Sequence, residues 1–186
     1  MNIPISNIEK LVTDPDLSFK RLWNELSWEK HGTTPRSEYY CNDNLVPYTY
    51  GSGNFARTYY PSPWHPVISE IRESLEKELN CVFDVCFLNM YENNKDHLGW
   101  HADDSPEMDD ARPIVTVSLG AEREIWFKEK GASNKPEDVT KVLLKNGSAC
   151  IMLPYMQKTH LHRIPKHDRD CGPRISLTFR GYVEPN

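Results

Sequence analysis

PRISLTFRGYV, residues 173–183, is the stretch that decides the fold. Apolar side chains occupy every second position: Ile175, Leu177 and Phe179. A period of two is that of a β-strand with one apolar and one polar face. The polar face carries the guanidinium groups of Arg174 and Arg180. Arginine turned toward the interior of a β-barrel needs an anion to bind.

Further strand-like stretches follow residue 81, separated by clusters of Gly, Pro, Asn and Asp. They are CVFDVCFLNMY (81–91), PIVTVSLG (113–120), REIWFKE (123–129), DVTKVLL (138–144) and SACIML (148–153). Short strands separated by turn residues are typical of all-β architectures. This part of the chain therefore predicts a β-sandwich or barrel and not a βαβ fold.

Two amphipathic helices are predicted before these strands, over residues 16–27 and 66–79, where apolar residues recur at helical spacing. Between them, residues 28–65 contain four prolines, three glycines and many tyrosines. This composition predicts loops and short hairpins rather than a third helix. Long loops of this kind are often functional. The fold class expected is mainly β with flanking helices.

Composition limits the function classes. With 186 residues, 38% of them hydrophobic, the chain suits one domain over residues 1–186, and we expect a monomer. The net charge of -5 argues against coating nucleic acid through bulk electrostatics, although a local basic stripe could hold a few phosphates. We expect no membrane association, because no stretch approaches the roughly 20 apolar residues of a membrane span.

Cysteine usage indicates the compartment. The five cysteines form an odd set without a Cys-x-x-Cys pair. Such a set favours free thiols in a reducing compartment over a disulfide framework or a zinc knuckle. We therefore expect a cytoplasmic location, or a nuclear one if the source is a eukaryote.

A candidate metal site lies at His101 and Asp103, with His162 further along the chain. Residues i and i+2 of an extended segment point the same way, so His101 and Asp103 can share a metal. Two histidines and one carboxylate on one face of a metal are typical of non-haem Fe(II) oxygenases. A His-x-Asp tripeptide is weak evidence alone, because a surface histidine near an aspartate is commonly just solvated.

Two arginines strengthen the oxygenase hypothesis. Arg174 and Arg180 are six residues apart, which is about 20 Å along one strand face. Their long side chains, leaning toward each other, could hold the two ends of a short dicarboxylate, because a guanidinium grips a carboxylate bidentately. The alternative is two structural ion pairs with acidic residues of the chain.

As a set, these motifs resemble the AlkB family of Fe(II)/2-oxoglutarate dioxygenases. The matching segments are Asn89-Met90-Tyr91, WHADD (100–104), PIVTVSLG (113–120), HRIP (162–165) and PRISLTFR (173–180). The resemblance runs from about Pro35 to Tyr182 and is closest to the eukaryotic-type DNA and RNA demethylases. It implies a double-stranded β-helix (jelly-roll) core over about residues 81–183 and a substrate-recognition lid over about residues 28–65.

The resemblance also implies individual roles. Iron would be held by His101, Asp103 and His162. His160 is the rival of His162, since both would point the same way on a strand, but His162 directly precedes the Arg-Ile-Pro step. Arg174 would clamp the distal carboxylate of 2-oxoglutarate. The other residues around this cosubstrate would be Asn89, Tyr91, Ile114, Ser176, Thr178 and Arg180.

Four residues are implied to bind the substrate: Tyr48, Tyr50, Trp100 and Asp104. A base that is to be oxidised must be turned out of its stack and held between flat side chains, which the two tyrosines and Trp100 can supply. Asp104 would favour a cationic methylated ring. The alternative is a tyrosine-rich hairpin that merely packs on the barrel.

The implied reaction is oxidative demethylation of N-alkylated bases in DNA or RNA. It needs Fe(II), 2-oxoglutarate and O₂, and it releases formaldehyde, succinate and CO₂. Single-stranded substrate is expected, because residues 28–34 contain no evident aromatic finger that could intrude into a duplex. Two alternatives are the same core hydroxylating a small molecule or a protein, and a catalytically silent jelly-roll binding module.

Overall fold

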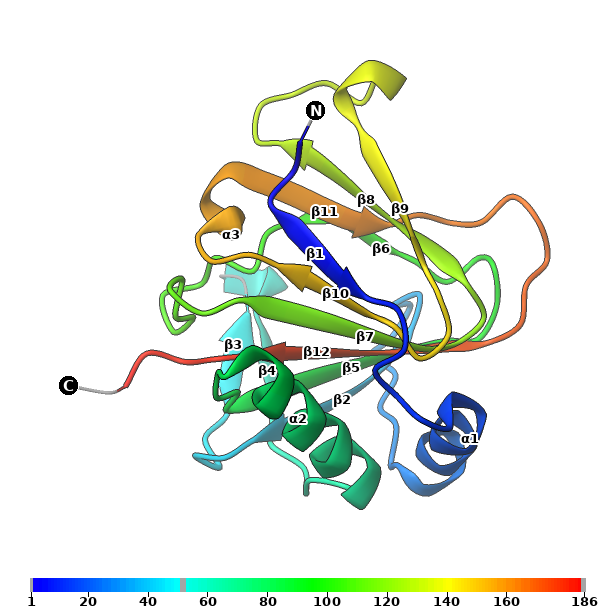
Figure 1. The fold of residues 1–186 in the computed structure, drawn as a ribbon, viewed down its shortest axis with the longest axis vertical. Coiled ribbons are helices and arrows are strands. Elements are labelled where there is room, and N and C mark those ends of the chain that lie inside the picture. The colour runs from blue at the N-terminus through cyan, green and yellow to red at the C-terminus, as the bar shows by residue number, and fades with distance from the viewer. Residues whose placement is uncertain (1, 51–52, 185–186) are drawn as a thin grey trace.

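The computed structural model describes residues 2–50 and 53–184, except for the side chains of Tyr50 and Phe55. Two antiparallel sheets form its core (Figure 1). The larger sheet has the strand order β1 (Ile5–Ile8), β10 (Ala149–Met152), β7 (Ile114–Gly120), β12 (Arg174–Arg180), β5 (Val85–Tyr91), β2 (Ser37–Asn42). The smaller sheet has the order β6 (Leu98–His101), β11 (His160–Ile164), β8 (Arg123–Glu129), β9 (Thr140–Leu144).

The eight strands from β5 to β12 form a double-stranded β-helix, or jelly roll. Strands β5, β7, β10 and β12 lie in the larger sheet, and β6, β8, β9 and β11 in the smaller one. Two sheets that share eight strands in this way are the jelly-roll solution to closing an antiparallel structure. Strands β1 and β2 extend the larger sheet at its two edges. The predicted mainly β fold with a jelly-roll core is confirmed.

Two helices cover one face of the larger sheet: α1 (Pro15–Glu25) and α2 (Pro66–Leu79). Each begins with a proline at its first turn and a side-chain cap, since Asp14 accepts a hydrogen bond from Leu17 N and His65 Nδ1 accepts one from Val67 N. Both predicted helices are confirmed. The described residues also contain the short helix α3 (Met156–Thr159) and the 3₁₀ helices η1 (Gly53–Phe55) and η2 (Pro136–Asp138).

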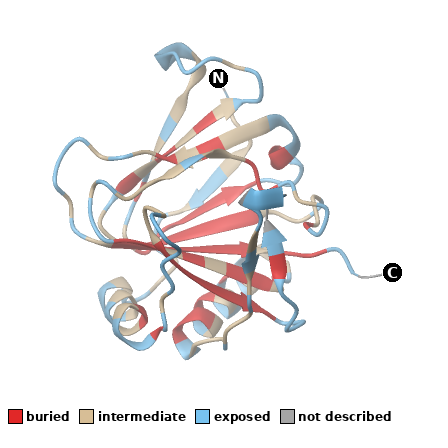
Figure 2. Ribbon diagram, turned by 180° about the vertical axis from the view of Figure 1, so that it is seen from behind, coloured by how far each residue is buried: buried red, intermediate tan, exposed pale blue. Residues whose placement is uncertain are grey.

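Strand β12 separates the hydrophobic core from the interior between the sheets. Its apolar face, which carries Ile175, Leu177 and Phe179, is fully buried in the cluster that includes Leu22 of α1 and Ile68 of α2. Figure 2 shows the larger sheet as the most buried part of the molecule. The other face of β12 carries the two arginines, so the alternation in the sequence predicts correctly which side faces the interior.

The segment between the two helices contributes to both scaffold and surface. Strand β2 pairs with β5, and all six of its residues are buried. Strands β3 (Tyr48–Tyr50) and β4 (Arg57–Tyr59) form a separate hairpin, as predicted. In the described ranges, no helix combines the length and apolar character that crossing a membrane requires.

Candidate active site

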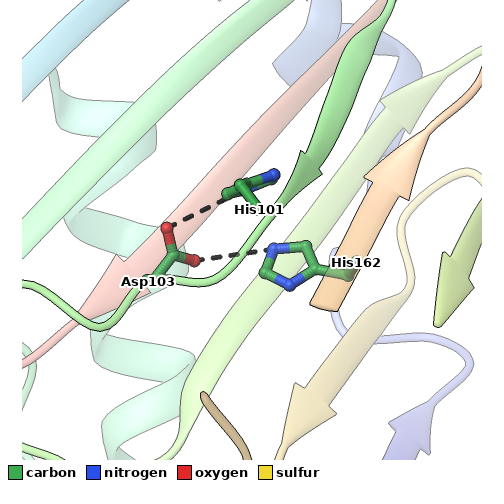
Figure 3. Close-up of side chains that lie close together, drawn as sticks. All are labelled: His101, Asp103 and His162. Atoms are coloured by element: carbon green, nitrogen blue, oxygen red, sulfur yellow. Dashed lines mark ion pairs between the residues drawn. The ribbon is translucent and has the colours of Figure 1, made fainter. Parts of the chain in front are cut away.

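Three side chains converge between the sheets as a metal site would require (Figure 3). His101 ends β6, Asp103 follows two residues later, and His162 lies on β11 directly opposite His101 in the strand register. One potential ligand atom from each residue lies within 4.8 Å of the others. His160 is outside this group, and its Nδ1 lies 2.7 Å from Thr159 Oγ1. The geometry favours His162 over His160 as the second histidine.

Backbone and side-chain contacts orient His101 and Asp103. His101 Nδ1 lies 2.8 Å from the carbonyl oxygen of Gly99, which leaves Nε2 directed at Asp103. The backbone N–H of Asp103 donates to Gln157 Oε1 at 3.0 Å. Such outer contacts fix the tautomer of a ligating histidine and the position of a ligating carboxylate. The chain therefore holds two of the three potential ligands in place through its own hydrogen bonds.

The protonation states suit a divalent cation. Burial, aided by nearby His101, lowers the pKa of His162 to about 3. Burial acts to raise the pKa of Asp103, but Arg180 and the two histidines outweigh it and hold that pKa below its ordinary value. Asp103 Oδ2 is buried and has no hydrogen-bond partner among the described residues. A neutral imidazole and an ionised carboxylate with a free oxygen fit Fe(II) as the bound group.

Arg174 has unused hydrogen-bond donors in a fully buried position. Its Nη2 donates to Ser118 Oγ at 2.9 Å, while Nε, Nη1 and the nearby Tyr91 hydroxyl have no partner in the described ranges. Burial lowers the pKa of Arg174 to about 10, so it is still charged at neutral pH. Within the described structure Arg174 makes no ion pair. A buried cation with free donors fits a carboxylate ligand better than a structural ion pair.

Arg180 lies at the other end of the same strand face and has a different partner. Its Nη2 is 3.1 Å from Asp103 Oδ1. The sequence-based alternative of structural ion pairs therefore applies to Arg180 and not to Arg174. The guanidinium of Arg180 thus lies at the metal site, at the opposite end of the strand face from Arg174, and the joint hold of the two arginines on one dicarboxylate stays a prediction.

The other residues assigned to the cosubstrate lie along the same strands. Ser176 and Thr178 are buried on the face of β12 between the two arginines. Tyr91 and Asn89 face Arg174 and Ser176 across the β5–β12 register, although Asn89 Oδ1 already accepts a bond from Arg36. Ile114 packs in the same buried cluster as Tyr91. Their roles toward 2-oxoglutarate stay predictions.

A cavity of about 210 Å³ adjoins the metal triad. His101, Asp103 and Arg180 line its inner end, and Tyr48, Tyr59 and Phe87 supply aromatic walls. Buried Glu38 lines it too, with Arg57 Nη2 at 2.6 Å and Arg36 Nη2 at 3.2 Å. The cavity therefore combines flat apolar walls with a charged network, directly beside the potential iron ligands.

The four predicted substrate residues are placed differently. Tyr48 lines the cavity and donates from its hydroxyl to Ser105 Oγ at 2.7 Å. The side chain of Tyr50 lies outside the described residues. Asp104 is exposed and pairs with Lys130 at 2.9 Å, so its carboxylate is already engaged. Trp100 is absent from the cavity lining, and its ring lies against Lys128 and Arg163, so its role in base stacking stays a prediction.

Sequence reasoning missed several residues of the site. Ser118, Gln157 and Glu38 contact Arg174, Asp103 and the two cavity arginines across long stretches of chain. Polar residues inside strands carried the only signal: Ser118 lies within PIVTVSLG and Glu38 beside the tyrosines of SEYYCN. Their partners depend on strand pairing, which the sequence alone does not define.

Comparisons with known proteins agree with this geometry. Residues 16–180 match the family model described as "2OG-Fe(II) oxygenase superfamily". The chain is 29% identical over 187 residues to "Alpha-ketoglutarate-dependent dioxygenase alkB homolog 3" of Homo sapiens, a match that covers 94% of this chain and 64% of that protein. It is 31% identical over 155 residues to "DNA oxidative demethylase ALKBH2" of Mus musculus, which covers 81% of this chain and 63% of that protein.

The chain thus spans less than two thirds of the length of these relatives. The solved structure called "The structure of OsALKBH1" superposes with a TM-score of 0.68 at 18% identity, covering 97% of this chain and 98% of that one. At this identity the superposition supports the fold alone. Since the family model matches residues 16–180, the similar curated proteins are AlkB homologues, and His101, Asp103 and His162 form a group that could hold iron, the chain belongs to the AlkB family within the 2OG-Fe(II) oxygenase superfamily.

Proposed function

We propose that this chain is a dioxygenase that oxidatively demethylates N-alkylated bases in DNA or RNA, with release of formaldehyde, succinate and CO₂. The observation that carries the proposal is the aromatic cavity lined by His101 and Asp103, which form the potential metal group together with His162. The names of the similar proteins, which include "DNA oxidative demethylase", support nucleic acid as the substrate class. We also propose a monomer that prefers single strands, located in the cytoplasm or nucleus.

The residues of the chain would hold the reactants rather than react themselves. His101, Asp103 and His162 would bind Fe(II), and Arg174 with Tyr91 would hold the far carboxylate of 2-oxoglutarate. Together with O₂, these cofactors supply the oxidation of a C–H bond. A hydroxylated N-methyl group then leaves as formaldehyde.

The cavity walls would position the substrate. Tyr48 and Tyr59 lie with ring centroids 6.4 Å apart and 25° between their planes, and Phe87 contacts both edge-on. An extruded base needs flat surfaces of this kind. Burial raises the pKa of Tyr59 to about 12, so its hydroxyl stays neutral beside the Glu38 carboxylate. The Tyr59 side of the cavity therefore adds no negative charge to that of Glu38.

Mass spectrometry of methylated oligonucleotides tests the proposal. Single- and double-stranded DNA and RNA, each with one N-methylated base, are incubated with protein, iron, ascorbate and 2-oxoglutarate, with the D103A variant as control. Loss of 14 mass units, with equal amounts of succinate and formaldehyde, is the expected result because each turnover removes one methyl group as CH₂. Succinate formation that no oligonucleotide stimulates would favour a small-molecule or protein substrate, and absence of turnover with 2-oxoglutarate bound would favour a binding module.

A further inference from the structure

The outer face of the smaller sheet carries a row of alternating aromatic and cationic side chains, here called the outer row: Trp100, Arg163, Trp126 and Lys141, with Lys128 beside Trp100. The row crosses all four strands, from β6 through β11 and β8 to β9. Arg163 faces Trp126, and Trp126 faces Lys141, in the strand register. His162 and Phe127 are their neighbours in the chain and point inward, so the row points away from the metal site.

Each cation of the outer row is held by an aromatic ring. Arg163 Cζ lies 4.5 Å from the ring centre of Trp126 and 5.1 Å from that of Trp100. Lys141 Nζ lies 4.2 Å from the Trp126 ring, and Lys128 Nζ lies 4.8 Å from the Trp100 ring. Cation–π contacts of this kind fix the position of a positive group without cancelling its charge.

The charges of the outer row are consequently available to a ligand. In the described parts of the chain, none of Arg163, Lys128 and Lys141 takes part in an ion pair, and Lys128 instead donates to Asn134 Oδ1 at 2.7 Å. The nearby carboxylate of Glu124 accepts a bond from Trp126 Nε1 at 2.7 Å. Three positive charges beside one negative charge stand out in a chain with a net charge of -5.

No helix of the described residues covers this face. The helices α1 and α2 pack on the larger sheet, and Figure 1 shows β6, β11, β8 and β9 at the opposite side of the molecule. Lys141 is exposed, and Leu143, two residues further on the same face, is 51% exposed. Solvent and ligands can therefore reach the row.

We propose that the outer row binds a single-stranded segment of nucleic acid that flanks the nucleotide in the cavity. Its phosphates would contact Arg163, Lys128 and Lys141, and its sugars and bases would contact the partly exposed indoles of Trp100 and Trp126. A row of positive charges between aromatic groups suits a single strand, whose phosphates and bases are both accessible. The inference rests on the proposed function in taking nucleic acid as the ligand.

The position of β6 connects the outer row to the cavity. Strand β6 is an edge strand of the smaller sheet. Leu98 and His101 of this strand line the cavity, whereas Trp100 belongs to the outer row. A strand that leaves the cavity over this edge reaches Trp100 and Arg163 first.

Binding of an unmodified, fluorescently labelled 12-nucleotide single strand tests the inference without requiring demethylation. The variant K128S/K141S removes two charges of the row and spares Arg163, which adjoins His162. The matched control K20S/K77S removes two exposed lysines from α1 and α2. Fluorescence anisotropy is measured from low to high salt, and the melting temperature of each variant verifies its fold.

K128S/K141S is expected to bind the 12-nucleotide strand on the order of tenfold more weakly at about 0.1 M salt. The slope of log K against log salt should also fall by about 1.4, because each of two lost phosphate contacts on a single strand contributes about 0.7. The control variant should retain the original slope. Equal losses in both variants would show a bulk charge effect and overturn the inference, as would unchanged binding of the row variant.

A second readout separates this inference from the proposed function. Demethylation of a methylated trinucleotide, which is too short to follow the row, should be the same in K128S/K141S as in the unaltered protein, while that of a 12-mer should slow. If K128S/K141S demethylates both substrates at unaltered rates, the proposed function is supported and the inference that the outer row binds nucleic acid is wrong. If K128S/K141S binds the 12-mer more weakly but the unaltered protein demethylates neither substrate, the outer row is supported and the proposed function is wrong.

Discussion

Arg180 Nη2 lies 3.1 Å from Asp103 Oδ1, and the same guanidinium lies 4.5 Å above the ring centre of Phe87. The last residue of β12 is therefore fixed between a carboxylate of the candidate metal site and an aromatic wall of the cavity. This contact leaves Asp103 Oδ2 without a hydrogen-bond partner among the described residues. Arg180 is thus a positioning residue for the metal ligand.

Replacing Arg180 should weaken metal binding. In R180M the side chain keeps much of its length but loses the charge that lowers the pKa of Asp103. We expect iron affinity to fall by about 10- to 100-fold, as for other contacts that orient a metal ligand. Titration with Co(II), followed by its visible absorption, measures the affinity. R57M, which removes another cavity arginine, is the control, and equal affinity in R180M would contradict the positioning role.

Substituting a predicted metal ligand should reduce activity far more than substituting the neighbouring His160. D103A and H162A are each expected to abolish metal-dependent turnover because each removes a ligand from a three-ligand site. H160A removes a histidine two residues from His162 whose Nδ1 contacts Thr159, and it should retain most activity. Bound iron and succinate formation are the measurements. Activity in H162A together with its loss in H160A would reverse the assignment.

Arg174 should govern cosubstrate affinity. In R174K a single ammonium replaces the planar fork, and it cannot reproduce bidentate contacts with a carboxylate. We expect at least a tenfold higher KM for 2-oxoglutarate, since one charge-assisted hydrogen bond contributes about 1.5–3 kcal/mol. Oligonucleotide affinity should change little. A KM that stays the same would mean that the free donors of Arg174 serve another ligand.

Single-stranded substrate should be demethylated faster than duplex of the same sequence. Extruding a base from a duplex costs a few kcal/mol, most of which a single strand avoids. The chain has a net charge of -5, and Trp28 of the 28–34 segment packs against the hydrophobic core and donates to the Leu22 carbonyl, so it is not available to intercalate. Initial rates on matched substrates measure the preference. A second variant, Y48F, tests the cavity wall. It loses only the hydrogen bond to Ser105 and disturbs the wall less than Y48A. Equal rates on duplex would point to an opening element near Arg36.

The cysteines should react in the order of their burial. Burial raises the pKa of Cys41 and of Cys150 to about 12 and that of Cys86 well above its ordinary value. Only the thiolate reacts with iodoacetamide, so these three should resist alkylation at about pH 8. Partly exposed Cys171 should be modified first. Peptide mass spectrometry after brief labelling checks this order, with denatured protein as the control.

Local patterns predicted the elements that depend on one buried face. Strand β12 and both long helices followed from periodicity because each has an apolar side that packs on the same core. Strand β2 was not predicted, since its residues alternate between the core (Tyr39, Cys41) and the charged cavity side (Glu38, Tyr40) and all are buried. A strand that is buried on both faces, one of them polar, has no amphipathic signal.

Site residues that lie close together in the sequence were predictable. His101 and Asp103 are two residues apart, and a period of two is enough to bring them together. The environment of Trp100 was not predictable, because it depends on which strand pairs with β6 and on the side chains that this strand and β8 present. The partner of Arg174, Ser118 on β7, depends in the same way on sheet order.

Strand β11 places two consecutive residues on opposite sides of one sheet: His162 faces the metal site and Arg163 the outer row. Its register with β6 shifts between His162 and Ile164, just beyond the ligand. Because the side-chain period is two, inserting or deleting one residue upstream within this strand would exchange the two faces. A length change there would turn the arginine toward the iron ligands and the histidine toward solvent, so this strand should tolerate substitutions far better than insertions or deletions.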